Sequence, residues 1–85
     1  MPSRNLKPPQ GLLRILAANI TRLRSERGWS QEELGSQAGL HRTYVGAVER
    51  GERNVTLSTL EAFASALDVT VVDLLSKGTP VARRK

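Results

Sequence analysis

Apolar residues recur along this chain at the spacing of an α-helix. The first stripe advances in steps of three and four residues, at Leu13, Leu16, Ile20 and Leu23. It places one apolar face on a helix of about residues 11–27, which would end at Gly28, because glycine is favoured just beyond a helix C-terminus. No stretch alternates cleanly between apolar and polar residues, so the pattern predicts an all-α fold.

The later helices share a start signal, in which an apolar residue precedes a polar cap and packs on a residue of the first helical turns. The signal occurs in four pairs: Trp29 and Leu34, Leu40 and Val45, Val55 and Leu60, and Val69 and Leu74. Ser30 and Thr70 also have an acidic residue three positions on, as a capping box requires. These starts predict four more helices, over about 31–38, 42–50, 57–67 and 71–76.

Two glycines shape the connection between the second and third predicted helices. Gly35 lies inside a helix, where glycine costs about 1 kcal/mol against alanine, which suggests that another backbone approaches there. Gly39 lies where that helix must stop and the chain must turn, a place that favours a positive φ. Together they predict two short helices at a steep angle, with no large apolar residue on the outer face of the second.

Length and composition limit what such a fold does. Eighty-five residues make one small domain. Thirteen Lys and Arg against eight Asp and Glu leave a net charge of +5, which points to a polyanionic partner. Cysteine is absent, which excludes thiolate metal sites and favours a reducing, cytoplasmic compartment. One histidine and no catalytic motif predict no enzymatic activity, no metal and no cofactor, and neither a signal peptide nor a membrane span is predicted.

Proline and charge divide the chain into three parts. Residues 1–10 hold three prolines and two cations and form a predicted basic arm. Residues 11–78 form the predicted domain, whose cations concentrate before residue 51, whereas 51–76 is mostly acidic. Residues 79–85 are a basic tail. The first half and the tail are therefore expected to face the anion. Whether the arm and the tail are disordered basic ends, or follow a groove if the anion is a nucleic acid, stays open.

The stretch from Ile20 to Leu75 resembles the lambda-repressor/Cro-type, Xre-like helix-turn-helix domain. The matching residues are Leu23-Arg24, Gly28 to Leu34, Ala38-Gly39-Leu40, Val48 to Gly51, Arg53-Asn54, Leu57, Leu60, Ala64, Ala66-Leu67 and Val69. Residues 41–44 and 49–54 also resemble the controller proteins of restriction–modification systems. The resemblance implies a five-helix DNA-binding domain with the helix-turn-helix at its second and third helices.

The resemblance also implies a recognition helix of about 42–50 in the major groove. Arg42 is the expected guanine reader, while Thr43 and Ala47 are suited to thymine contacts. The implied DNA-backbone contacts are Gln31, His41, Tyr44, Arg50, Arg53 and Asn54. Plainer roles stay open: a solvated Arg42, a helix cap for His41, a neutral helix start for Thr43 and core packing for Tyr44.

Two further groups of residues are predicted, an ion pair and a dimer surface. Arg24 and Glu49 adjoin core positions, and the resemblance implies that they pair beneath the recognition helix. A homodimer on a near-palindromic operator is expected from more apolar surface than a one-turn helix buries, at Val69, Val71, Val72, Leu74 and Leu75. The predicted function is transcriptional regulation through double-stranded operator DNA. The alternatives are an antitoxin or other module that binds a partner protein and, more weakly, a membrane-surface peptide.

Overall fold

A computed structural model describes residues 10–78, and within that range it contains five helices and no strand. The helices are α1 (Gln10–Glu26), α2 (Gln31–Ala38), α3 (Arg42–Glu49), α4 (Leu57–Leu67) and α5 (Val71–Leu74). The predicted boundaries agree to within two residues, and the largest difference is at α5, which ends in a turn at Leu75. The predicted arm and tail lie outside the described residues, except that Gln10 already belongs to α1.

The predicted start signals form as expected. Ser30 Oγ accepts a hydrogen bond from Glu33 N at 2.9 Å, and Glu33 Oε1 accepts one from Ser30 N at 2.8 Å, which completes a capping box. Thr70 and Asp73 form the same reciprocal pair at α5. The apolar residues that precede the four caps, Trp29, Leu40, Val55 and Val69, all pack against the core, and their partners Leu34, Val45, Leu60 and Leu74 are buried in it.

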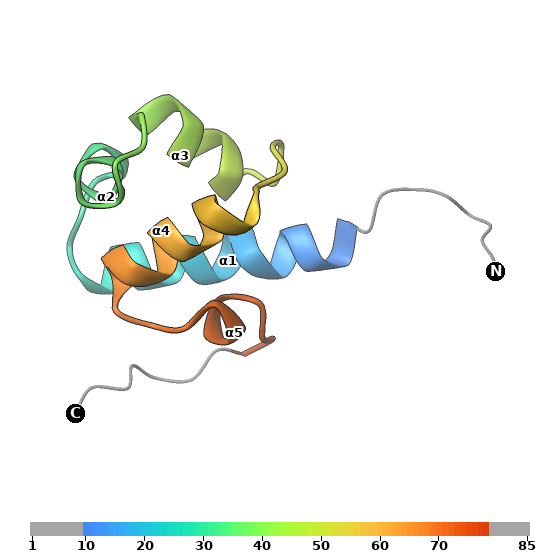
Figure 1. Ribbon diagram of the computed structural model, residues 1–85. Coiled ribbons are helices and arrows are strands. Elements are labelled where there is room, and N and C mark those ends of the chain that lie inside the picture. The colour runs from blue at the N-terminus through green and yellow to red at the C-terminus, as the bar shows by residue number, and fades with distance from the viewer. Residues whose placement is uncertain (1–9, 79–85) are drawn as a thin grey trace, which may run out of the picture.

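α1 is the helix around which the others assemble. It contacts α3, α4 and α5, while α2 packs on α3 and α4. Figure 1 shows α2 and α3 on one side of α1 and α5 on the other. The largest fully buried side chain is Phe63 of α4, surrounded by leucine, isoleucine and valine from all five helices. This single core fixes the orientation of α2 and α3.

Asn19 is a buried polar residue at the junction of α1 and α5. Its Nδ2 donates hydrogen bonds to the carbonyl oxygens of Leu74, at 2.8 Å, and Ser76, at 2.9 Å. The last carbonyl groups of a helix have no partner within it, so this amide supplies the partners that α5 lacks. Because α5 is only four residues long, its position depends on α1.

Candidate nucleic-acid interface

Two glycines close the turn between α2 and α3. Gly35 is buried, and a Cβ atom there would overlap the backbone carbonyl oxygen of Leu40. Gly39 adopts a left-handed conformation with φ 74°, and Leu40 N donates to Gly35 O at 2.8 Å. The predicted close approach at Gly35 and positive φ at Gly39 are both confirmed. The turn sets α3 at a steep angle to α2 (Figure 1) and leaves the first residues of α3 exposed.

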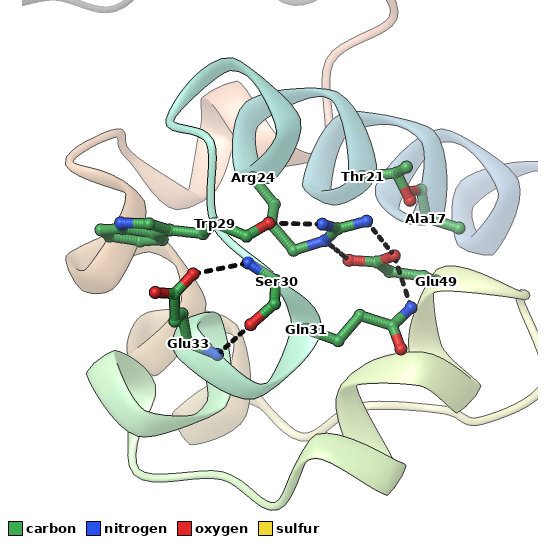
Figure 2. Close-up of polar contacts among 8 residues, drawn as sticks. All are labelled: Ala17, Thr21, Arg24, Trp29, Ser30, Gln31, Glu33 and Glu49. Carbon is green, nitrogen blue, oxygen red and sulfur yellow. Dashed lines mark hydrogen bonds and ion pairs between the residues drawn. The ribbon is translucent and has the colours of Figure 1, made fainter.

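A largely buried ion pair joins this motif to the end of α1. Arg24 Nε donates to Glu49 Oε2 at 2.7 Å and Arg24 Nη2 donates to Oε1 at 3.2 Å, with side chains 17% and 5% exposed. Arg24 Nη1 also donates to the carbonyl oxygen of Trp29 at 2.6 Å, and Gln31 Nε2 donates to Glu49 Oε1 at 2.9 Å. Figure 2 shows these four residues, here called the clamp, converging from α1, the following loop, α2 and α3.

Gln31 therefore also helps to hold Glu49 in place, a role that the sequence pattern did not indicate. One of its two amide N–H groups is bonded to Glu49, which leaves the other for an outside partner. Gly46 provides the space, since a Cβ atom there would lie 3.1 Å from Gln31 Oε1 and 3.3 Å from Arg50 Nη1. A glycine inside α3 thus lets the Gln31 side chain cross the helix. No local signal predicts a contact between residues this far apart in the chain.

His41 caps α3 with its ring. Its Nδ1 accepts a hydrogen bond from Thr43 N at 3.0 Å and lies 2.7 Å from Thr43 Oγ1. An Nδ1 that accepts an N–H carries no proton, so in the neutral ring the proton resides on Nε2. The predicted capping role of His41 is confirmed, and an Nε2–H donor remains for an outside acceptor.

Arg42 extends from the first residue of α3 into solvent. Its side chain is 64% exposed, and its Nη1 lies 3.7 Å from Oε1 of Glu32, which is 74% exposed. Exposed ion pairs of this kind contribute about 0–1 kcal/mol, so the pair restrains Arg42 only loosely. Thr43 beside it is also exposed, whereas Ala47, one turn further along α3, is half-buried. The exposed start of α3, residues 41–43, is here called the reading end.

Tyr44 connects α3 with the loop before α4. Its ring is half-buried against the core, and its hydroxyl donates to the carbonyl oxygen of Asn54 at 3.2 Å. The Arg53 guanidinium lies over the ring, 5.3 Å from its centroid, which is a cation–π contact. Core packing is therefore part of the role of Tyr44. Arg50 is exposed at the end of α3 and pairs with Glu52 at 3.1 Å.

The apolar surface differs from the predicted one. Leu74 is wholly buried in its own core, so its predicted place in a dimer interface is wrong; it is the helix-start partner of Val69, and that packing uses its side chain. Val72 remains 72% exposed. The pattern did not point to Leu57, 79% exposed, or Leu12, 48% exposed. These two border an apolar groove of about 320 Å³, which Leu13, Leu16, Val55, Leu60 and Leu75 also line.

Residues 10–78 lack two other kinds of site, metal sites and membrane-spanning helices. They contain no group of three side chains able to hold a metal ion. None of their helices is long and apolar enough to span a membrane. What stands out is a helix-turn-helix whose second helix presents polar and cationic side chains. These features define the class of DNA-binding helix-turn-helix proteins.

Comparison with known proteins leads to the same class. Residues 20–74 match the helix-turn-helix family model. The control protein C.SmaI of Serratia marcescens is 54% identical over 63 residues, covering 74% of this chain and 75% of that protein. The crystal structure of the hypothetical transcription factor NHTF from Neisseria superposes with a TM-score of 0.78 at 46% identity, covering 92% of this chain and 88% of that one.

A third similar structure contains DNA. It is the restriction–modification controller protein C.Esp1396I, a tetramer in complex with its natural 35-base-pair operator, with a TM-score of 0.68 at 36% identity over 74% of this chain and 83% of that one. The present chain belongs to the helix-turn-helix family. It is a DNA-binding transcriptional regulator close to the restriction–modification controller proteins, and not an enzyme.

Proposed function

We propose that this protein binds a specific operator sequence as a homodimer and thereby regulates transcription. The observation that carries the proposal is the contrast between the exposed reading end of α3 and the buried clamp behind it. A side chain that reads a base needs a fixed backbone and an end group that is accessible to DNA. At the start of α3 the clamp holds the helix in place, while the guanidinium of Arg42 is exposed. α3 would then lie in the major groove with its N-terminus toward the base edges.

Three residues of α3 are the proposed base contacts. Arg42 can donate two parallel hydrogen bonds to O6 and N7 of guanine. Thr43 can contact a neighbouring base edge with its hydroxyl or methyl group, and Ala47 can contact a thymine methyl. Because Gly46 and Ala47 carry no polar side chain, we propose that part of the specificity comes from DNA shape.

The proposed contacts to the sugar–phosphate backbone surround these residues. They are Gln31, His41, Tyr44, Arg50, Arg53 and Asn54. The second amide N–H of Gln31 and the Nε2–H of His41 are suitable donors, because the first N–H of Gln31 is bonded to Glu49 and Nδ1 of His41 accepts from Thr43 N, which holds both side chains in place. Arg53, stacked on Tyr44, presents its guanidinium edge in a restricted orientation.

Dimerisation is proposed through the apolar groove and the exposed face of α5. Leu75, Leu12 and Leu57 line or border the groove, so Leu75 stays in the proposal and Leu12 and Leu57 join it. The predicted residues Val69, Val71 and Val72 also stay, because their side chains are not fully buried in the core. A two-fold axis pairs the same patch on both copies, and Leu57 beside its own groove suits such an arrangement. The operator-bound tetramer of C.Esp1396I supports assembly on DNA. Two recognition helices would then meet half-sites about 34 Å apart.

Two measurements test the proposal. Selection of bound DNA from a random pool, followed by footprinting, should return a near-palindrome with two half-sites. Light scattering of the free protein should give twice the 9.3 kDa mass of one chain at working concentration. A monomeric mass, or a stable complex with a different protein instead of DNA, would contradict the homodimeric operator-binding function.

A further inference from the structure

Three glutamates belong to the helix-turn-helix, and two of them have evident structural partners. Glu33 closes the capping box with Ser30, and Glu49 is the anion of the clamp. Glu32 is different, since its one side-chain contact within residues 10–78 is the 3.7 Å approach of its Oε1 to Arg42 Nη1 at the reading end. Its charge in the first turn of α2 favours that helix, but Glu33 supplies the same charge one residue away.

A carboxylate at this place lowers affinity for DNA in general. Both side chains are more than half exposed, and they border one shallow hollow with Ser36, Leu40 and His41. A phosphate that approaches Arg42 meets the negative charge of Glu32 as well. Like charges in contact are costly at an interface, so the presence of Glu32 beside the proposed base reader needs a compensating benefit.

The benefit follows from the difference between a guanine and a phosphate. Guanine is neutral and offers two acceptors, O6 and N7, so an arginine with five N–H donors binds it and still keeps a carboxylate partner. A phosphate is an anion and competes with the carboxylate for the same guanidinium charge. An Arg42–Glu32 pair is therefore compatible with a base edge and unfavourable with the DNA backbone.

We propose that Glu32 is a specificity-determining residue, which holds Arg42 in an ion pair that guanine preserves and phosphate must break. The inference rests on the proposed function, because it takes Arg42 as a base reader. In operator DNA, Glu32 orients the guanidinium and balances its charge within the groove. On random DNA, Arg42 stays with Glu32 and neutralises no phosphate.

The test compares Glu32→Gln with Glu33→Gln. Both variants gain one unit of charge at adjacent positions of α2, and glutamine at position 33 still completes the capping box. Affinities are measured for the selected operator and for random DNA of equal length, over a range of salt concentrations. Thermal unfolding of both variants reports on the stability of α2.

For Glu32→Gln we expect random-DNA affinity to rise about three- to tenfold, with a salt dependence steeper by about one unit. Operator affinity should stay equal or fall, so the ratio of the two affinities falls. Glu33→Gln should change both affinities by the same small factor and keep the ratio. In an Arg42→Ala background, Glu32→Gln should no longer change the ratio, because no guanidinium remains to be held.

Equal affinity ratios for the two glutamine variants would overturn the role of Glu32, as would a loss of affinity for both DNAs. That failure differs from failure of the proposed function itself. If the wild-type protein enriches no sequence from a random pool, operator binding is refuted and the role of Glu32 with it. If an operator is enriched, the comparison of the two variants decides the role of Glu32 alone.

Discussion

The clamp and the reading end occupy opposite ends of the eight-residue helix α3, and they differ in almost every physical respect. In the clamp, Glu49 is 5% exposed and accepts three hydrogen bonds from two side chains. At the reading end, Arg42 is 64% exposed and lies beside a single carboxylate at 3.7 Å. The same type of ion pair therefore stabilises the motif at one end and stays exchangeable at the other.

This difference separates residues that hold the helix from residues that meet DNA. Breaking a buried pair leaves an uncompensated charge in a shielded place, whereas breaking an exposed pair costs little because water replaces the partner. Substitutions in the clamp should thus lower stability first and DNA binding as a consequence. Substitutions at the reading end should lower specificity and leave the fold intact.

The largest effect is expected from Glu49→Ala. It leaves Arg24 without its anion and Gln31 without its acceptor, which should lower the free energy of unfolding by about 3–5 kcal/mol. Thermal or urea unfolding measures the change, and DNA binding should fail over the same temperature range. Replacing Arg24 and Glu49 together by apolar residues of similar volume should recover part of the loss. Unchanged thermal stability of Glu49→Ala would refute a structural clamp.

The glycines inside α2 and α3, Gly35 and Gly46, provide a second, smaller contrast. Gly35→Ala places a Cβ atom against the backbone of Leu40, so we expect a loss of about 2–3 kcal/mol. Gly46→Ala meets only the ends of Gln31 and Arg50, which can shift, and gains up to about 1 kcal/mol of helix propensity. Urea titration of the two variants measures both effects. Equal destabilisation would mean that the approach at Gly35 is not a packing constraint.

Arg42→Ala removes the proposed base contact at the reading end of α3. The melting temperature should fall by no more than about 4–8 °C, because the exposed ion pair of Arg42 contributes at most about 1 kcal/mol to stability. Discrimination at one base position per half-site should fall by about 1–3 kcal/mol. Competition binding with operators mutated at each position measures this loss. An equal loss on operator and random DNA would contradict base reading by Arg42.

Arg53→Ala should give the smallest effect. As a phosphate contact, Arg53 should weaken binding to all sequences alike and reduce the salt dependence by about one unit. Its stack on Tyr44 is exposed, so stability should change by no more than about 1 kcal/mol. Binding isotherms at several salt concentrations measure the slope. A selective loss on operator DNA would instead make Arg53 a specificity residue.

The fold follows from local signals in the sequence to a large extent. Apolar spacing, the capping residues and the glycine at position 39 act within a few residues of chain, and each element formed where its signal lay. Gly35 was also informative, because an unfavourable residue inside a helix requires a compensating contact. The pairing of Arg24 with Glu49 came from family resemblance, and the bidentate geometry seen here could not be obtained from spacing.

Contacts between distant parts of the chain account for what the sequence did not predict. Nothing near Gln31 indicates that its amide reaches Glu49 across Gly46, and nothing near Asn19 indicates that it serves α5. Leu74 was predicted to serve both a helix start and a dimer surface, and burial allows only the first. Leu12 lies beside the apolar stripe of α1 and not within it, so the spacing of apolar residues did not single it out. The groove that Leu12 borders forms only where α1 packs against α4 and α5.

The hydrogen bonds from Asn19 to the carbonyl groups of Leu74, at the end of α5, and of Ser76, just beyond it, have a consequence for how the molecule opens. A four-residue helix has no stability of its own, and its C-terminal partners come from a residue more than fifty positions earlier in the chain. α5 therefore cannot fray by itself without breaking bonds to the centre of α1. The amides of Leu74 and Leu75, which donate to the carbonyl oxygens of Thr70 and Val71, should therefore exchange as slowly as amides of the core. This links the lifetime of the surface proposed for dimerisation to global unfolding.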